Sequence, residues 1–275
     1  MVTFFEIVGQ TLDRGYDDIK DEHRDEKISA RLKEMGVGFR NFVLTEGGPN
    51  YGDKITRFAY VYKYTPANAD YIDQMIKWSK AIQEVLNRDK ISLTCIGGGP
   101  GSDVLGFLKF LIERGETPHI KFFILDKETA WAETWADLDD IVAGSLPLSK
   151  DFRPFDVTNP STYEFNRPFE SDIFTMIYFL SEVFVHKDAV TRFLKTCFAR
   201  MKKGALLIVI DFKHADVQSW IDTCAKQGGL EGSGKEEELV MDTSEQKSIL
   251  KRYSDKFNIE PKIRSQVFYR LFRKT

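Results

Sequence analysis

The chain has 275 residues, of which 42% are hydrophobic and 29% are charged, with a formal net charge of -3. A chain of this length can bury a substantial core within one large domain. The small acidic excess argues against a dedicated nucleic-acid-binding protein, because such proteins usually carry a basic excess that meets the phosphates.

Cysteine usage and the N-terminus indicate where the protein works. The three cysteines, Cys95, Cys197 and Cys224, lie far apart and form no Cys-x-x-Cys pair, so we expect neither a bound metal nor a disulfide framework. The first residues lack a basic segment, and Glu6 comes too early for a signal peptide. No apolar run reaches roughly 18 residues, so no membrane span or membrane partner is expected. These features predict a cytoplasmic protein, with a nuclear location also open.

Residues 1–90 differ in character from the rest of the chain. Asp17–Arg31 is densely charged with few apolar residues, which predicts a solvated helix. Aromatic residues alternate through Phe58–Tyr64, as in a strand, whereas Ala69–Leu86 has apolar residues at helical spacing. We interpret residues 1–90 as an N-terminal helical and aromatic extension.

From Ile91 onward, short apolar runs alternate with stretches of helical spacing. This alternation is typical of a parallel sheet whose crossover helices cover both of its faces. The expected strands and helices are, in chain order, Ile91–Ile96, Ser102–Arg114, Ile120–Leu125, Trp131–Val142, a short strand ending near Asp156, Asp172–Phe179, Asp188–Met201 and Ala205–Ile210.

The C-terminal part predicts an antiparallel ending to this α/β sheet. Phe257–Arg264 and Gln266–Phe272 both alternate, and so little chain lies between them that they must pair antiparallel. The glycine-rich Gly228–Gly234 and the charged Lys235–Glu238 that follows are typical of a flexible surface loop.

The strongest local signal is a glycine-rich turn between a strand and a helix. The apolar run Leu93–Ile96 leads into Gly97-Gly98-Gly99-Pro100-Gly101, and a helical stretch follows. Glycines here let the backbone approach a ligand closely at the start of a helix. A nucleotide-type ligand is the usual occupant of this crevice, although glycines also form tight turns without any ligand.

The spacing of the glycines discriminates between ligands. Dinucleotide sites need GxGxxG, whereas Gly97, Gly99 and Gly101 form GxGxG and the position that would complete the longer pattern is Val104. The run resembles motif I of class I S-adenosylmethionine (SAM)-dependent methyltransferases, and the pattern agrees with that family over Ile91–Thr275. The resemblance implies a seven-stranded, mostly parallel sheet with a terminal antiparallel strand, and a SAM-binding domain at residues 91–275. It implies SAM as the cofactor and S-adenosylhomocysteine as its product.

Two acidic residues are candidates for this cofactor site, and one position differs from the pattern of the resembling family. Asp126 ends the second strand and can accept hydrogen bonds from both ribose hydroxyls, as can the equivalent acid of NAD-binding folds. The resemblance implies that Asp156 and Val157 contact adenine, although Asp156 also suits a turn. Where the family has an acid that holds the ammonium group, this chain has Cys95. Asp103 is either its substitute or a first-turn acid favoured by the helix dipole.

The complete set of expected cofactor contacts includes two tyrosines of the extension. In many enzymes of the resembling family the segment before the domain forms a lid, and tyrosines there can bracket the sulfonium through cation–π attraction. Core packing is an equal alternative for these rings. The set is Gly97, Gly98, Gly99, Pro100, Gly101, Asp103, Asp126, Lys127, Asp156, Val157, Tyr60 and Tyr64.

The end of the fourth strand is expected to face the methyl acceptor. The candidates there are Tyr178, Ser181, Glu182 and His186. Glu182 can pair with a cationic amine and His186 can act as a base, while Glu182 also suits a helix start and His186 an exposed loop. The chain lacks the Asn/Asp-Pro-Pro-Tyr/Phe motif, which argues against adenine-N6, cytosine-N4 and glutamine acceptors of that kind.

The leading interpretation is a methyltransferase that acts on a small molecule or a protein. An RNA methyltransferase is one alternative, for which Lys251, Arg252, Lys256, Lys262, Arg264, Arg270, Arg273 and Lys274 would form a phosphate track. A catalytically silent SAM-fold binding protein is another, supported by Cys95. Hydride transfer with NAD is opposed by the GxGxG spacing.

Overall fold

The computed structural model describes residues 3–38, 49–116, 118–143, 148–163, 167–243 and 247–275. Its strands are β1 (Lys90–Ile96), β2 (His119–Asp126), β3 (Leu148–Pro154), β4 (Ile173–Ile177), β5 (Leu206–Phe212), β6 (Leu230–Val240) and β7 (Arg264–Lys274). They form one seven-stranded sheet in the order β3-β2-β1-β4-β5-β7-β6. Strand β7 runs antiparallel to β5 and β6, and the other pairs are parallel. The predicted α/β sheet with one antiparallel strand is confirmed.

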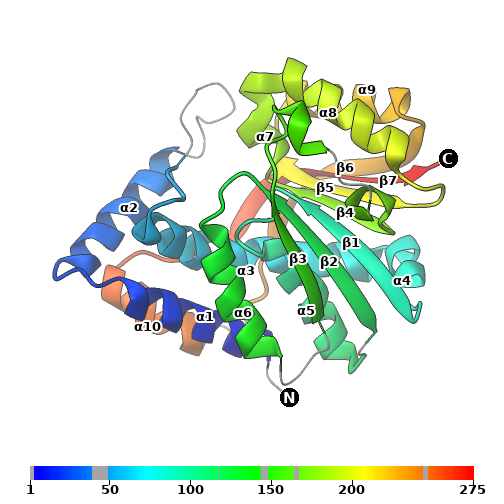
Figure 1. Ribbon diagram of the computed structural model, residues 1–275. Helices are drawn as coiled ribbons and strands as arrows, with labels where there is room; N and C mark the ends of the chain where they lie inside the picture. Colours follow the sequence, from blue (N-terminus) through cyan, green and yellow to red (C-terminus); the bar gives the residue numbers. More distant parts are fainter. Residues whose placement is uncertain (1–2, 39–48, 117, 144–147, 164–166, 244–246) are drawn as a thin grey trace.

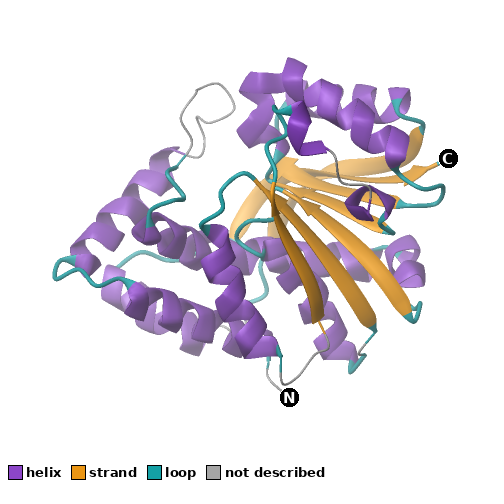
Figure 2. Cartoon of the chain, viewed as in Figure 1, coloured by secondary structure: helices purple, strands orange, loops and turns teal. Residues whose placement is uncertain are grey.

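Helices cover both faces of the sheet (Figures 1 and 2). Alternate residues of β5 show why, since Ile208 packs into one apolar cluster while Leu207 and Val209 pack into another on the opposite face. One face carries α4 (Lys80–Leu86), α5 (Ser102–Arg114) and α6 (Trp131–Val142), and the other carries α8 (Lys187–Arg200) and α9 (Ala215–Gln227). The helical turns η2 (Pro160–Tyr163), η3 (Arg167–Glu170), α7 (Leu180–Val183) and η4 (Phe184–His186) lie in the connections before and after β4.

A separate group of helices lies beside the sheet (Figure 1). It comprises α1 (Phe4–Asp18), α2 (Arg24–Gly38), α3 (Lys54–Trp78) and, from the C-terminal part, α10 (Lys247–Phe257). Thr3 starts α1 with a capping box, in which its hydroxyl accepts from the Glu6 N–H and the Glu6 carboxylate accepts from the Thr3 N–H. The predicted continuous helix over Asp17–Arg31 is wrong, because the chain turns after Asp18 and buries Ile19 between α1 and α2.

The strand-like alternative for Phe58–Tyr64 is also wrong, since these residues belong to the long helix α3. Asp53 caps this helix by accepting the Thr56 N–H at 2.9 Å. Phe58, Tyr60, Tyr62 and Tyr64 are all at most 7% exposed. A helix that is buried on every side loses the one-sided apolar spacing by which helices are recognised in a sequence.

The C-terminal antiparallel pair is formed by different segments from those expected. Phe257–Arg264 is not a strand, because α10 ends at Phe257 and β7 begins at Arg264. The antiparallel partner of β7 at the sheet edge is β6, which includes Leu230–Glu238, most of the segment that was expected to be a loop. As an edge strand, β6 is exposed on both sides, and its charged side chains discourage pairing with other molecules. A Cβ atom at Gly234 would overlap the backbone of Tyr269, so glycine permits this close pairing.

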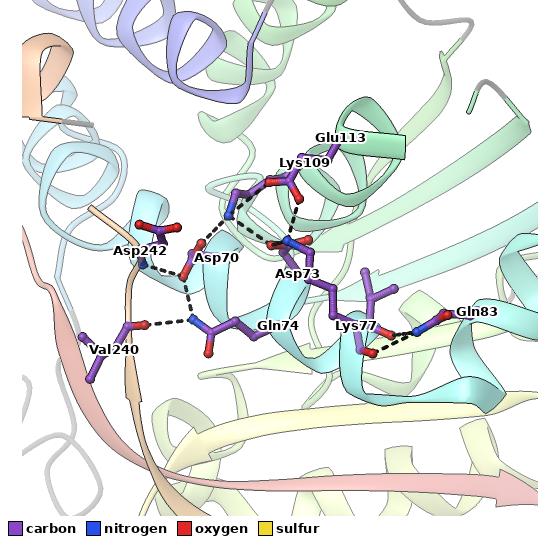
Figure 3. Close-up of polar contacts among 10 residues, drawn as sticks. Asp70, Asp73, Gln74, Lys77, Gln83, Lys109, Glu113, Val240 and Asp242 are labelled. Carbon is purple, nitrogen blue, oxygen red and sulfur yellow. Dashed lines mark hydrogen bonds and ion pairs between the residues drawn. The ribbon is translucent and has the colours of Figure 1, made fainter. Parts of the chain in front are cut away.

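A buried ion cluster joins α3 to α5 (Figure 3). Lys109 of α5 donates to Asp70 and, at 3.0 Å, to Asp73, both on α3. The second oxygen of Asp70 accepts from the Gln74 side chain at 2.7 Å and from the Asp242 backbone at 3.1 Å. We call Lys109, Asp70 and Asp73 the Lys109 cluster. Its contacts tie α3 to the sheet domain and to the segment that follows β6.

The connections leaving β1 and β4 turn to opposite sides of the sheet, so the carboxyl ends of these two adjacent strands form a topological switch point. Ligands of open α/β sheets bind in the crevice at such a point. The described helices include none that is both long enough and apolar enough to cross a membrane.

Candidate active site

The glycine turn lies at this switch point, between β1 and α5. Gly97 and Gly101 have φ angles of +71° and +83°, in the left-handed region that favours glycine. A Cβ atom at Gly97 would come within 2.5 Å of the Phe179 ring. The strand, glycine turn and helix predicted from the sequence are confirmed.

Three aromatic rings lie above the turn. Trp131, which is 2% exposed, packs directly on Gly99, where a Cβ atom would overlap its indole ring. The rings of Tyr51 and Tyr60 lie 5.3 and 6.0 Å from that of Trp131, measured between centroids. Trp135 donates its indole N–H to the Gly99 carbonyl at 3.0 Å. We call Tyr51, Tyr60 and Trp131 the aromatic roof; the sequence pointed only to Tyr60 among them.

A cavity of about 470 Å³ opens between the glycine turn and the aromatic roof, which is within the range of small-molecule sites. Of the expected site residues, those that line it are Gly97, Pro100, Asp103, Asp126, Lys127, Asp156, Val157, Tyr60, Tyr178, Glu182 and His186. The other five, Gly98, Gly99, Gly101, Tyr64 and Ser181, lie outside the lining. Ser181 is buried, and its backbone N–H donates to Asp211 at 2.9 Å.

Asp126 lies on the floor of the cavity, at the end of β2. One carboxylate oxygen accepts from the Gly99 N–H at 2.8 Å, and the other from the Glu128 N–H at 2.9 Å. Burial outweighs these hydrogen bonds and raises the pKa of Asp126 to about 6. Each oxygen can accept a second hydrogen bond, so the carboxylate can hold a diol while it stays attached to the turn.

A second carboxylate stands close to Cys95, the position where the resembling family has an acid. Asp103, in the first turn of α5, is 2% exposed and accepts from the Thr175 hydroxyl on β4. Burial and, next, the charge of Asp103 raise the pKa of the Cys95 thiol. Burial also raises the pKa of Asp103 to about 7. A carboxylate from α5 therefore stands close to the side chain of β1 that replaces the usual acid.

Ser102 was not expected from the sequence. It is 2% exposed and lines the cavity, and its hydroxyl has no hydrogen-bond partner within the described part of the chain. Buried polar groups are nearly always paired, so an orphan at a cavity wall indicates a group that a ligand satisfies. Its position as the first helical residue after the glycine turn was the signal that could have found it.

Asp156 keeps its charge at the far end of the cavity. Its carboxylate accepts from the Thr158 N–H at 2.9 Å and pairs with Lys127 at 3.2 Å. Burial raises the pKa of Asp156, but the hydrogen bonds from Thr158 and Lys127 outweigh burial and hold it below its usual value. The hydrogen bonds with Thr158 show that Asp156 also stabilises its own turn.

Tyr178 directly follows β4 and has an unusual backbone conformation. Its φ of +53° is rare for a residue with a side chain, and such strain is concentrated at functional sites. Its hydroxyl accepts from the Lys262 ammonium group at 3.2 Å. Lys262 lies over the rings of Tyr178 and Phe212, and burial lowers its pKa to about 7.

Glu182 lies on α7 and faces the same cavity. Its side chain is exposed to solvent at the cavity wall. Desolvation by the surrounding wall, followed by repulsion from Asp126 and Asp211, raises the pKa of Glu182 to about 8. The nearest hydrogen-bond donor is the Tyr51 hydroxyl, at a long 3.5 Å. His186 is exposed beside it and also lines the cavity.

The basic residues of the C-terminal part do not form a continuous phosphate track. Lys262 is partly buried over the rings of Tyr178 and Phe212. Several others are engaged with acids: Arg252 with Asp13, Lys256 with Asp25, Arg264 with Glu238, and Arg270 with Asp222. They divide between α10 and β7, and the interactions leave few charges for phosphates.

No known family model matches the chain, and no curated protein matches it by sequence. Among solved structures it is similar to the CurJ carbon methyltransferase, with a TM-score of 0.53 and 13% identity, over 96% of this chain and 71% of that one. It is also similar to a methyltransferase from Pyrococcus furiosus (TM-score 0.46, 12% identity, 89% and 96% covered). A SAM-dependent methyltransferase from Methanosarcina mazei gives a TM-score of 0.45 and 15% identity, with 71% and 97% covered.

These identities bear on the fold alone. The CurJ comparison covers nearly the whole chain with a TM-score above 0.5, which is similarity of fold. The chain therefore has the fold of class I SAM-dependent methyltransferases.

Proposed function

We propose that the chain binds SAM in the cavity at the switch point and transfers its methyl group to a small molecule or a protein. The observation that carries this proposal is the set of groups in the cavity wall. Asp103 and Asp126 have no cationic side chain as a partner among the described residues, and the orphan hydroxyl of Ser102, the chain neighbour of Asp103, lines the same cavity. SAM carries an ammonium and a sulfonium against one carboxylate, so its net charge suits this wall.

Each part of SAM has a matching group. Asp126 would hold the ribose hydroxyls, and Asp103 would hold the ammonium group that the family's acid usually binds. The Ser102 hydroxyl, at the N-terminus of α5, would donate to the carboxylate. Asp156 and Val157 would contact the adenine. SAM itself supplies an activated methyl group on a sulfonium, so the protein mainly has to align donor and acceptor.

Residues 1–90 are proposed to act as a lid. Tyr51 and Tyr60 come from this segment, and both line the cavity. The Lys109 cluster attaches α3 to the sheet domain, which supports a lid whose inner part is fixed. Aromatic rings above the donor can stabilise its sulfonium through cation–π attraction.

The alternatives receive less support. An RNA acceptor would need basic side chains near the cavity, whereas those of the C-terminal part are engaged with acids. A silent binding protein was suggested by Cys95, but Asp103 offers a carboxylate close to that position.

Calorimetric titration with SAM, S-adenosylhomocysteine and NAD tests the cofactor. We expect binding of the first two only, and Asp126→Asn should weaken SAM binding by roughly 10- to 100-fold, because a hydrogen bond to a charged group contributes about 1.5–3 kcal/mol. Asp140→Asn is the matched control, since the Asp140 side chain is 78% exposed and pairs with Arg14 on the surface. Preferential binding of NAD, or equal SAM affinity in both variants, would contradict the proposal.

A further inference from the structure

We propose that the part of the cavity beside Glu182 binds an amine as its ammonium ion, and that Glu182 accepts the proton that makes this amine a methyl acceptor. The proposal rests on the proposed function and names the acceptor class for the same site. It starts from the cavity, its aromatic wall and the position of Glu182 at the carboxyl end of β4.

The cavity wall carries more acidic than basic groups. Five carboxyl groups line the described part of the wall, those of Asp103, Asp126, Glu128, Asp156 and Glu182, against one lysine, Lys127, and one histidine, His186. The lysine is paired with Asp156. Bound SAM would neutralise only part of this charge, so a second ligand that is cationic fits better than an anionic one.

Glu182 is the carboxylate of this group that is most available to such a ligand, because it has no close hydrogen-bond donor among the described residues. Asp126 is held by two backbone N–H groups, and Asp103 by the Thr175 hydroxyl. Glu182 has only the long contact with the Tyr51 hydroxyl, and within the described chain no lysine or arginine pairs with it. Its oxygens can therefore accept the N–H groups of an ammonium ion.

The aromatic roof supplies the second half of an ammonium site. Tyr51 contacts Glu182 and lies 5.4 Å from Tyr60 between ring centroids. A carboxylate beside aromatic rings is the combination that recognises ammonium groups, because the rings attract cations through their faces. A phenolate, enolate or nucleic-acid phosphate would instead meet like charge wherever these carboxyl groups are ionised, and this favours an amine over oxygen, carbon and RNA acceptors.

The proton transfer follows from the same contacts. The N–H bond breaks, its electron pair stays on nitrogen, and the proton moves to a carboxylate oxygen of Glu182. The freed nitrogen pair forms the new N–C bond as the S–C bond breaks. The two electrons of the broken S–C bond stay on sulfur in S-adenosylhomocysteine. An alkylammonium has a pKa of about 10.4, and that of Glu182 is raised to about 8, so the transfer is only moderately uphill.

The groups around Glu182 support its role as a proton acceptor. Tyr51 and Tyr60 face it from the lid side, Asp126 from the end of β2 and Asp211 from the end of β5. The nearest ionisable groups are thus neutral or anionic, with His186 at the cavity wall. Below about pH 8 the protonated form of Glu182 predominates, so binding of an ammonium ion should strengthen as the pH rises.

The test uses the full chain saturated with S-adenosylhomocysteine, whose binding is first measured by calorimetry. Phenethylammonium and its neutral isostere 2-phenylethanol are then titrated and followed by ligand-detected NMR. We expect the ammonium to bind at least about tenfold more tightly than the alcohol. Glu182→Gln should remove this difference, and Glu170→Gln, an exposed glutamate of η3, should keep it.

A pH series separates charge recognition from a structural effect. From pH 6 to 9 the ammonium affinity of the wild-type chain should rise, while that of Glu182→Gln stays flat and its affinity for S-adenosylhomocysteine is unchanged. Equal binding of alcohol and ammonium, no binding of either, or an unchanged ammonium affinity in Glu182→Gln would overturn the amine proposal alone. Failure of S-adenosylhomocysteine to bind would overturn the proposed function and, with it, this inference.

Discussion

Helix α5 contributes to two buried groups of charges, the Lys109 cluster toward α3 and the cavity carboxylates at its N-terminus, and the two groups differ in their partners. In the Lys109 cluster, Asp70 and Asp73 are at most 1% exposed, and each meets the Lys109 ammonium group. Asp70, Asp73 and their hydrogen bonds outweigh burial and hold the pKa of Lys109 above its usual value. In the cavity, burial raises the pKa values of Asp103 and Asp126 with no cation to oppose it.

This difference distinguishes charges that stabilise the folded state from charges that are available to bind a ligand. The Lys109 cluster sets a cation against its two carboxylates, although one Asp73 oxygen has no hydrogen-bond partner among the described residues and burial raises the pKa of Asp73. A buried carboxylate without any cation costs more folding free energy. Titratable groups perturbed in this way are concentrated at functional sites. The contrast between the Lys109 cluster and the cavity carboxylates is thus itself an indication of function.

The largest expected effect is the loss of the central cation. Lys109→Met should lower the free energy of unfolding by about 3–5 kcal/mol, because it leaves the buried Asp70 without a cation and Asp73 with only the half-exposed Lys77. Lys77→Met is the control, since Lys77 also contacts Asp73 but its side chain is 43% exposed; its expected cost is below about 1 kcal/mol. Urea unfolding measures both. Equal losses would show that the cluster does not stabilise the fold as a buried pair.

A carboxylate of the cavity should give the opposite result. Asp103→Asn should weaken SAM binding by roughly 10- to 100-fold, or about 1.5–3 kcal/mol, and should leave stability at pH 8 unchanged or higher. The physical reason is that the folded chain no longer buries an unpaired charge. Calorimetry and urea unfolding provide the two readings. A large loss of stability with normal SAM binding would make Asp103 a structural residue.

The smallest expected effect is on pH dependence. A carboxyl whose pKa is raised by folding, as for Asp103 at about 7 and Asp126 at about 6, stabilises the folded state at low pH and loses this contribution as the pH rises through the folded pKa. Between pH 5 and 6 the ligand-free chain should therefore lose on the order of 1 kcal/mol per pH unit for each of the two groups, and between pH 6 and 7 for Asp103 alone. Unfolding in urea at pH 5, 6 and 7 measures the slope, which Asp103→Asn should reduce. A slope that is flat or rises with pH would contradict uncompensated carboxylates in the cavity.

Local patterns in the sequence predicted the regular part of the fold well. The glycine turn, the strand before it and the helix Ser102–Arg114 are confirmed, because glycine spacing and short apolar runs are properties of neighbouring residues. Prediction failed at α3, which is buried on all sides, and at β6, whose glycines and charges resemble a loop. In both cases the conformation depends on partners that are distant in the sequence.

The residues of the candidate site also fall into those that the sequence predicted and those that it did not. The sequence pointed to Gly97, Asp126 and Glu182, since each follows a strand whose end could be predicted. It did not point to Tyr51, Ser102 or Trp131, because nothing in their neighbours shows that they face a common cavity.

By itself, the sequence determined the sheet, the glycine turn and the acid that follows the second strand, because these depend on local spacing and backbone conformation. Only the tertiary structure decided that Asp103 stands close to Cys95, that Lys262 packs over the Tyr178 and Phe212 rings, and that Glu182 lies beside Tyr51. Burial and the pairing of charges arise from segments far apart in the chain, so they exist only once it has folded.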